Sequence, residues 1–274
     1  MGSVEINYQY HYTDEFYKLN REYSKKSPQV IVPLVLELLR CQGVIDVGCG
    51  DGTWLKVFQQ FGVEEILGVD GYYLDRNSLV ISKEQFFPFD LTKPLHLDRQ
   101  FDLAVSLEVA EHLPAESADI FINSLTSLAP VILFSAAIPH QPGEHHINTQ
   151  WPNYWVNLFQ ARNYVVIDCI RKKIWHNPDV AYWYAQNILM FVQRDYLENN
   201  LLLKQELEKN EHSALSIVHP ELYIHTVKKL YKAADPEKMS FKDTLSKLIK
   251  IIIRILKRQI NSLTTKVENN EGYE

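Results

Sequence analysis

One twelve-residue segment constrains the fold more than any other part of the chain. Residues 44–55 read VIDVGCGDGTWL, in which an apolar run suited to a strand ends in a Gly-x-Gly-x-Gly loop before a helix-length segment. Glycines permit backbone conformations and close approaches that a Cβ atom would block, so Gly48 and Gly50 would let a ligand lie against the main chain. A glycine loop between a strand and a helix is typical of the ligand-binding edge of an α/β sheet.

Short β-branched or apolar runs recur after this segment, with helix-length stretches between most of them. Neighbouring parallel strands need a crossover connection, so the alternation predicts an α/β fold with a Rossmann-like, doubly wound and mostly parallel sheet. A helix is expected at residues 29–40, and another at 151–159 with Pro152 in its first turn. The apolar face of this second helix is predicted to consist of Trp151, Tyr154, Trp155, Leu158 and Phe159. The expected strands are residues 44–47, 66–69, 101–106, 131–134, 164–169 and 188–192.

The composition divides the chain into three expected parts. Residues 1–27 form an N-terminal lead-in, residues 28–195 the ligand-binding domain, and residues 196–274 a helical C-terminal extension. Within the extension, residues 241–263 are predicted to form a basic amphipathic helix, because Lys and Arg gather on one side and Leu and Ile on the other. Such a helix suits an anionic membrane surface, self-association or docking on its own domain, and these alternatives stay open.

Composition and charge narrow the classes of protein. A chain of 274 residues that is 46% hydrophobic can bury one substantial core. Its net charge of −6 argues against broad nucleic-acid binding, so a small molecule or glycan is the expected partner and nucleic acid is not. Cys41, Cys49 and Cys169 are too few and too scattered for a disulfide framework. Neither a signal peptide nor a membrane span is evident, and we expect a cytoplasmic protein, with membrane association as the alternative.

Acidic residues follow the strands at the expected ligand edge. Asp46 precedes the glycine loop, Asp70 ends the run ILGVDG, and Asp90 lies in FPFDLT. A carboxylate at Asp46 would repel a pyrophosphate but attract an amino group and a sulfonium, which favours S-adenosylmethionine over NAD. Asp70 would accept hydrogen bonds from both ribose hydroxyls. Asp90 and Leu91 are expected at the adenine amino group and ring edge.

Together these motifs resemble the class I S-adenosylmethionine-dependent methyltransferases between residues 31 and 192. The similar segments read DVGCGDGTWL, LGVDG, FDLAVSLEVAEHLP, FSAAIP, HHINTQWPNYW and WYAQN, the wording of a bacterial subgroup. The resemblance implies methyl transfer from S-adenosylmethionine and a seven-stranded sheet whose last, antiparallel strand is expected at residues 184–192. Its implied cofactor contacts are Asp46, Gly48, Cys49, Gly50, Asp70, Gly71, Asp90, Leu91, Leu107 and Glu108.

The segment FDLAVSLEVAEHLP also raises the question of a metal. One helical turn would align Glu108, Glu111 and His112, which are spaced i, i+3 and i+4. The string is similar to a divalent-ion site of ubiquinone-biosynthesis O-methyltransferases and small-RNA 3′-end methyltransferases, but it also occurs in relatives without metal. Three ligands without an evident fourth favour a site without metal, and the metal site stays the alternative.

Histidines are the candidates for catalysis. Methyl transfer to a hydroxyl needs a base for its proton, and His140, His145 and His146 follow the fifth strand. We predict His146 as the catalytic residue, with His145 and His112 as further candidates; solvated loop histidines are the alternative. The expected reaction is O-methylation of a small-molecule, saccharide or natural-product acceptor. The alternatives are a non-catalytic S-adenosylmethionine-binding scaffold and an NAD-type oxidoreductase.

A cluster of aromatic and amide side chains precedes the last expected strand. Two interpretations of it stay open, a surface that stacks on a sugar or ring and hydrogen-bonds its hydroxyls, or core packing at a strand end. The cluster consists of Trp175, Asn177, Trp183, Tyr184, Gln186 and Asn187.

Overall fold

A computed structural model describes residues 26–210, 214–234, 245–246 and 248–254 of the chain. The chain divides into two compact units, Met1–Leu222 and Tyr223–Glu274. The first unit holds the sheet and the site described below. The domain limits predicted from composition stay a prediction.

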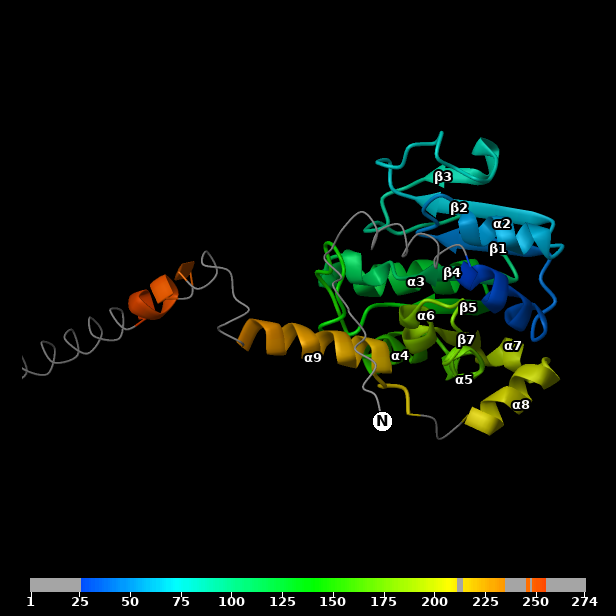
Figure 1. Ribbon diagram of the computed structural model, residues 1–274. Coiled ribbons are helices and arrows are strands. Elements are labelled where there is room, and N and C mark those ends of the chain that lie inside the picture. The colour runs from blue at the N-terminus through cyan, green and yellow to red at the C-terminus, as the bar shows by residue number, and fades with distance from the viewer. Residues whose placement is uncertain (1–25, 211–213, 235–244, 247, 255–274) are drawn as a thin grey trace, which may run out of the picture. The chain divides into compact units, whose positions relative to one another are not determined.

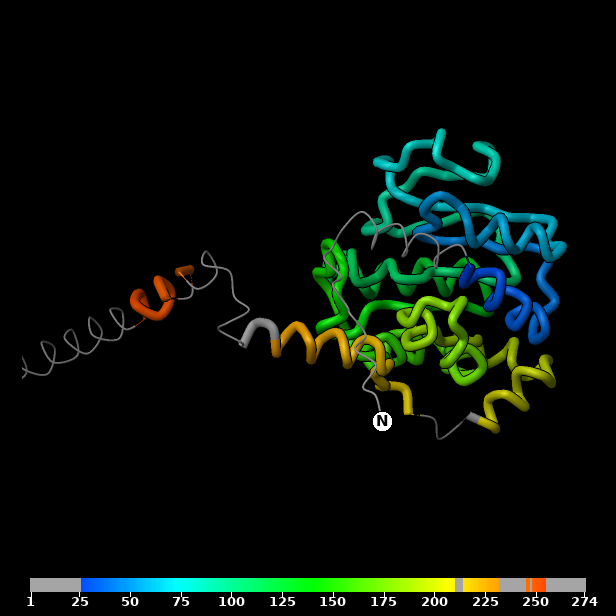
Figure 2. The backbone as a smooth tube through the Cα atoms, viewed as in Figure 1, coloured from blue at the N-terminus to red at the C-terminus, as the bar shows by residue number. Residues whose placement is uncertain are grey.

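A seven-stranded sheet forms the centre of the first unit, in the order β3-β2-β1-β4-β5-β7-β6 (Figure 1). From β1 the chain moves out to β3 and then returns to continue from β4, a reversal that Figure 2 shows as blue and cyan on one side and green on the other. β7 runs antiparallel to both of its neighbours, β5 and β6, and the other pairs are parallel. The strands are β1 (Gly43–Val47), β2 (Glu65–Asp70), β3 (Phe86–Pro88), β4 (Leu103–Leu107), β5 (Val131–Ser135), β6 (Tyr164–Ile167) and β7 (Leu189–Gln193). This arrangement confirms the predicted mostly parallel, Rossmann-like sheet.

Helices cover both faces of the sheet, because alternate strand residues point to opposite sides. On β1, Val44 packs into one apolar cluster, whereas Ile45 and Val47 pack into the other. The Ile45 face is covered by α3 (Ala118–Leu128) and α4 (Pro152–Gln160). The Val44 face is covered by the helical residues 26–36, α2 (Thr53–Gln60), α5 (Arg171–Ile174), α6 (Tyr182–Asn187), α7 (Arg194–Glu198) and α8 (Leu201–Asn210). The result is a three-layer sandwich with two cores.

Several details differ from the sequence-based predictions, among them the first helix, which covers residues 26–36 and not 29–40. The last strand does not begin at Tyr184, because residues 182–187 form α6 and the Ile188 N–H donates to the carbonyl oxygen of Tyr184 at 3.0 Å. β3 was not predicted, since a strand of three residues shows no alternation. In α4 the buried side chains are Pro152, Trp155, Val156 and Phe159, while Trp151 is 43% exposed and lies outside the helix.

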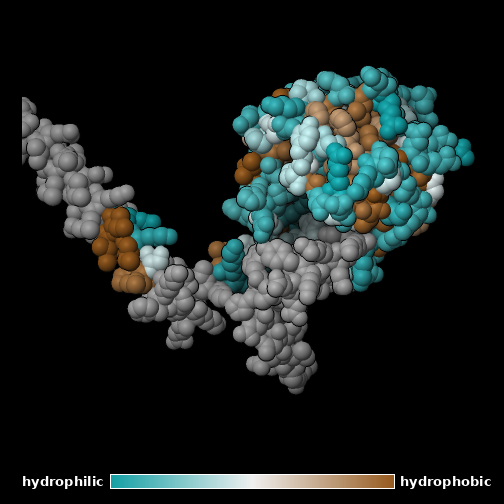
Figure 3. All heavy atoms as spheres, turned by 90° about the horizontal axis from the view of Figure 1, so that it is seen from above, coloured by the Kyte–Doolittle hydropathy of each residue, from teal (hydrophilic) through white to brown (hydrophobic). Residues whose placement is uncertain are grey.

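The C-terminal region is described only in part. The predicted amphipathic helix at residues 241–263 lies largely outside the described residues, of which 245–246 and 248–254 are helical. In Figure 3 this short helix shows apolar atoms along one side and hydrophilic atoms along the other. Among the helices that the structure describes, none is long and apolar enough to cross a membrane. The three cysteines are free, as expected.

Candidate active site

The glycine loop after β1 has a backbone that other residues adopt poorly. Gly48 has a φ of +91°, and a Cβ atom there would lie 2.3 Å from a methyl group of Val109. Gly50 has a φ of +53°, and nothing lies within 4 Å of the place where its Cβ would be. Gly48 is therefore required for close packing against the segment after β4, whereas Gly50 leaves its main chain open to a ligand.

Two carboxylates end the neighbouring strands β1 and β2. The strands run in register with Asp46 opposite Gly68, so Asp46 and Asp70 lie at the same edge, and both are buried. Burial first, and then the charges of Asp70 and Asp51, raise the pKa of Asp46 well above its usual value. Buried carboxylates at one edge favour a ligand with positive charge. Together with the open main chain at Gly50, these residues fit the cationic S-adenosylmethionine expected from the sequence.

Asp70 already has three hydrogen-bond donors. Its Oδ2 accepts from the Gly50 N–H at 2.7 Å, and its Oδ1 accepts from the Gly71 N–H and from the Tyr73 hydroxyl, both at 2.6 Å. Tyr73 is 85% exposed, so its ring can rotate away at little cost in buried area. The Tyr73 hydroxyl donates to an oxygen of Asp70 that a ribose hydroxyl would otherwise use. Tyr73 was not predicted, because nothing in the motif marks a third partner for Asp70.

Asp90 and Leu91 follow β3 and differ in their surroundings. Leu91 is buried in the core beneath α3, whereas Asp90 is exposed. Asp90 Oδ1 accepts from the hydroxyl and N–H of Thr92, at 2.7 and 3.0 Å, and these bonds lower the pKa of Asp90. The other carboxylate oxygen is the one left to reach a ligand.

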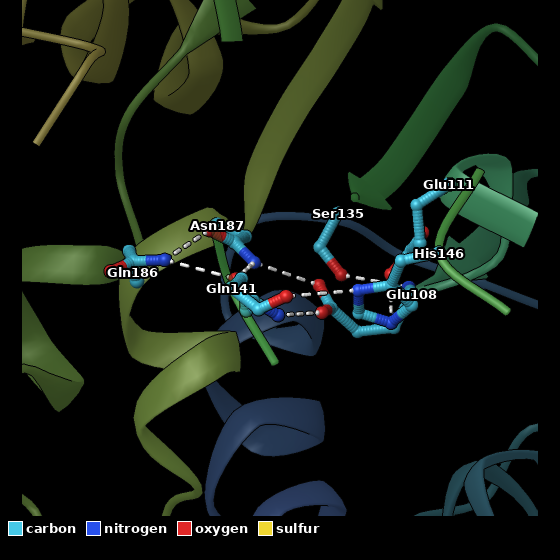
Figure 4. Close-up of polar contacts among 7 residues, drawn as sticks. All are labelled: Glu108, Glu111, Ser135, Gln141, His146, Gln186 and Asn187. Atoms are coloured by element: carbon cyan, nitrogen blue, oxygen red, sulfur yellow. Dashed lines mark hydrogen bonds and ion pairs between the residues drawn. The ribbon is translucent and has the colours of Figure 1, made fainter. Parts of the chain in front are cut away.

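Glu108 follows directly after β4 and is fixed by amide side chains from distant segments (Figure 4). Gln141 Nε2 donates to one carboxylate oxygen at 2.7 Å, and Asn187 Nδ2 donates to the other at 3.0 Å. The Gln186 amide donates to Gln141 Oε1 at 3.1 Å and completes the network. Burial raises the pKa of Glu108, although these hydrogen bonds oppose the shift. Gln141 was not predicted, and Gln186 and Asn187 serve this buried network rather than an open surface.

A second carboxylate, Glu111, lies beside the His146 ring (Figure 4), and His112 belongs to the same cluster. Glu111 is fully buried, and neither side-chain oxygen has a hydrogen-bond partner among the described residues. His146 Nε2 lies 4.0 Å from Glu111 Oε1, and the His112 and His146 rings are 5.0 Å apart with an edge-to-face arrangement. Burial and the Glu108 charge raise the pKa of Glu111 to about 9. Burial lowers the pKa of both histidines.

The loop after β5 brings His146 to this cluster. The N–H groups of Ile147 and Asn148 donate to the Glu111 carbonyl oxygen, at 2.9 and 3.0 Å. His140 and His145 lie on the same loop but are exposed, with φ angles of +70° and +55°. The structure thus brings together Glu111, His112 and His146. Glu108, with a φ of +56°, lies outside the turn at Ala110–His112, so the three residues do not share one helical turn as the sequence suggested. Both oxygens of Glu108 accept from amides, and its carboxyl group also interacts with that of Glu111.

A cavity of about 660 Å³ lies elsewhere, next to α5 and α8. It is lined by Asp168, Trp175, His176, Lys209 and Ile217 among others. It follows β6, at the sheet edge, and is separated from β1 by β4, β5 and β7. Trp175 therefore lies away from the glycine loop. Tyr184, in contrast, packs edge-to-face on Trp54 in the core, with ring centroids 5.2 Å apart.

Comparisons with known proteins agree with this arrangement. A family described as "Methyltransferase domain" matches residues 20–168. The sugar N-methyltransferase KedS8 from Streptoalloteichus sp ATCC 53650 shares the fold, with a TM-score of 0.50 and 14% identity over 71% of this chain and 98% of that chain. No curated protein sequence is similar to the chain at a significant level.

Two further solved structures are similar at lower scores. The methyltransferase domain of bacterial CtHen1 has a TM-score of 0.47 and 19% identity, over 62% of this chain and 98% of that chain. Magnesium protoporphyrin IX methyltransferase from Synechocystis PCC 6803, solved with bound S-adenosylmethionine, has a TM-score of 0.44 and 21% identity, over 70% of this chain and 86% of that chain.

The family match spans more than half of the chain and includes the glycine loop, Asp70, Glu108 and Glu111. Of the two cofactors considered from the sequence, this family match supports S-adenosylmethionine and not NAD. The chain belongs to the methyltransferase-domain family and is a class I S-adenosylmethionine-dependent methyltransferase with a Rossmann-like fold.

Proposed function

We propose that this enzyme methylates an oxygen atom of a small-molecule or saccharide acceptor, and that the acceptor binds beside Glu111, His112 and His146. The observation that supports this most directly is the convergence of these side chains next to the glycine loop. Val109 packs on Gly48, and His112 follows it by three residues. A group that removes a proton is therefore close to the expected position of the methyl donor.

The cofactor contacts would come from the ends of β1, β2 and β4. The main chain at Gly48, Cys49 and Gly50 would lie against the methionine part, with Asp46 as its anionic neighbour. Asp70 and Gly71 would hold the ribose, once the Tyr73 hydroxyl has left Asp70.

The remaining contacts would complete the donor pocket. Asp90 and Leu91 would meet the adenine, and Leu107 and Glu108 would form the wall next to the acceptor. The amides of Gln141 and Asn187 would keep the Glu108 carboxylate in one orientation.

Proton removal is the step that this chain's own residues perform. S-adenosylmethionine, when bound, supplies a methyl carbon that bonds to the acceptor oxygen while the carbon–sulfur bond breaks and its electron pair stays on sulfur. His146 would take the hydroxyl proton at Nε2, because its Nδ1 lies 3.2 Å from the Gln141 carbonyl oxygen and is used as a donor there. His112 is the second candidate, and the exposed His145 the third.

Isotope transfer into pooled acceptors tests the proposal. Labelled S-adenosylmethionine is incubated with the full chain and with separate pools of sugars, lipids, small metabolites and RNA, and products are identified by mass. We expect label as an O-methyl ether in a small-molecule or saccharide pool, with release of S-adenosylhomocysteine. Label on nitrogen, or in RNA alone, would contradict the assignment of the acceptor. Cofactor binding without turnover in any pool would favour a binding scaffold.

A further inference from the structure

The hydroxyl of Tyr73 bonds to the carboxylate that the ribose of the donor is expected to use. It donates to Asp70 Oδ1 at 2.6 Å, and the N–H groups of Gly71 and Gly50 donate to Oδ1 and Oδ2 at 2.6 and 2.7 Å. An ionised carboxylate offers about four acceptor positions, and these bonds use three of them. Two ribose hydroxyls need two positions, so both can bond to Asp70 only after the Tyr73 hydroxyl has left.

A glycine provides the space in which the Tyr73 ring lies. A Cβ atom at position 71 would be 2.1 Å from Cε1 and 2.5 Å from Cδ1 of this ring. Gly71 is not one of the glycines with a positive φ, so its backbone conformation is open to other residues. The missing side chain at Gly71 therefore serves the ring, and it lets the Tyr73 hydroxyl reach Asp70.

The contact of Tyr73 with Asp70 is held by its hydrogen bond and not by burial. Tyr73 lies in the turn after β2, where the Leu74 N–H donates to the Gly71 carbonyl oxygen at 3.2 Å. The side chain is 85% exposed, so rotation away from the end of the strand loses little buried area. A hydrogen bond to a charged group is stronger than one between neutral groups, which favours the bonded rotamer until another donor replaces it. Tyr73 thus combines a specific contact with the freedom to leave.

We propose that Tyr73 competes with the ribose of S-adenosylmethionine and S-adenosylhomocysteine for Asp70, and that it thereby lowers the affinity for both and speeds release of the product. The proposal rests on the ribose contact of Asp70 in the proposed function and is independent of the acceptor. A ligand binds only those molecules in which its site is free, so its apparent affinity falls with their fraction. With the Tyr73 contact formed in roughly 90% of cofactor-free molecules, binding is about tenfold weaker than at an open site.

Product release is the step that this competition would affect most. S-adenosylhomocysteine keeps the ribose of the donor, so the same hydroxyls still bond to Asp70 after methyl transfer. When one of them separates, the Tyr73 hydroxyl can take its place, and the carboxylate is not left without that partner. This exchange lowers the cost of release. The enzyme would therefore be inhibited less by its own product.

Titration calorimetry of the full chain with S-adenosylhomocysteine tests the proposal. Tyr73→Phe removes the hydroxyl and keeps the ring, whereas Tyr73→Ala removes both. We expect each variant to bind the ligand roughly three- to tenfold more tightly than wild type, with a lower dissociation rate in stopped-flow measurements. Tyr72→Phe is the matched control, because Tyr72 is the neighbouring tyrosine and is 74% exposed. Its affinity for S-adenosylhomocysteine should equal that of wild type.

The same substitution in an Asp70→Asn chain shows whether Tyr73 acts through Asp70. Loss of the charge should remove the competition, so adding Tyr73→Phe to Asp70→Asn should change the affinity by less than about twofold. Damage to the fold would weaken binding in either chain. A gain in affinity that requires Asp70 is therefore the signature of competition.

The outcomes separate this inference from the proposed function. If Tyr73→Phe binds S-adenosylhomocysteine as wild type does, or more weakly, the competition is overturned, even if the enzyme methylates a saccharide oxygen. An equal gain in Tyr72→Phe, or a gain that persists in the Asp70→Asn chain, overturns it as well. Tighter binding that requires Asp70 supports the competition, whichever acceptor the labelling experiment identifies.

Discussion

At the scale of single residues, Asp70 has the clearest testable role. Replacing it with Asn keeps the size but removes the charge that now accepts from Gly50, Gly71 and Tyr73. Hydrogen bonds to a charged group contribute about 1.5–3 kcal/mol, so Asp70→Asn should weaken S-adenosylmethionine binding by roughly 10–100-fold. Calorimetric titration measures this change. Unaltered affinity would remove Asp70 from the cofactor site.

His146 should affect turnover and leave cofactor binding nearly intact. His146→Asn removes the Nε2 atom that lies 4.0 Å from Glu111 Oε1, while the donor contacts expected from Asp46 and Asp70 are unchanged. Loss of a group that removes a proton lowers a rate by about 10²–10⁴-fold. Single-turnover transfer, run beside a cofactor titration, separates the two effects. A normal methyl-transfer rate in His146→Asn would show that His146 is an ordinary loop residue.

Local motifs predicted some of these residues and not others. Asp46, Gly50 and Asp70 follow adjacent parallel strands, so their common edge follows from the chain order alone. The approach of His146 to Glu111 depends on how the loop after β5 folds back, which no periodicity encodes. The amide partners of Glu108 likewise come from segments far away in the sequence. The cofactor contacts and catalytic roles assigned to these residues stay predictions.

At the scale of secondary-structure elements, the parts that were predicted are again those with a local sequence pattern. The strands β1, β2 and β5 are long apolar runs between turns, and they lie within one or two residues of their expected bounds. The resemblance implied that the last strand begins at residue 184, but the segment Tyr182–Asn187 lies before that strand. It forms a helix because its buried residues, among them Tyr184 and Ala185, pack against the core while Asn187 reaches Glu108.

The end of β1 provides a prediction that depends on pH. Burial, and then the charges of Asp70 and Asp51, raise the pKa of Asp46 in the fold, so the cofactor-free protein is destabilised once this group ionises. The penalty is absent below the unfolded pKa of about 3.9 and grows as pH rises through the folded value. Asp46→Asn should therefore have a higher melting temperature than wild type at neutral pH, by roughly 2–4 °C for each kcal/mol of destabilisation that the substitution removes. In acid the two melting temperatures should be equal.

Cofactor addition should reverse this order. A cationic donor compensates the Asp46 charge, so S-adenosylmethionine should raise the melting temperature of wild type more than that of Asp46→Asn at neutral pH. Thermal melts at several pH values, with and without the donor, check both statements. If S-adenosylmethionine raises the melting temperature of Asp46→Asn as much as that of wild type, Asp46 does not face the donor.

At the scale of the whole molecule, the first compact unit should hold everything that cofactor binding needs. All the expected contacts lie between Asp46 and Glu108, within the unit Met1–Leu222. A chain ending at residue 240 should bind S-adenosylmethionine as tightly as the full chain. Loss of cofactor affinity on truncation would contradict the assignment of the site.

Flotation of both chains with anionic liposomes tests the separate expectation for residues 241–263. Equal recovery of the two chains would exclude membrane attachment through that segment.

We infer that a glycine loop flanked by two buried carboxylates binds a cationic adenosyl donor at the edge of a parallel sheet. Titration calorimetry of the full chain with S-adenosylmethionine, S-adenosylhomocysteine and NAD tests this inference. We expect one site that binds both adenosyl ligands, no heat of binding with NAD, and loss of the site in the double variant Asp46→Asn, Asp70→Asn. A folded wild-type chain with no affinity for either adenosyl ligand, or a double variant that binds them unchanged, would contradict it.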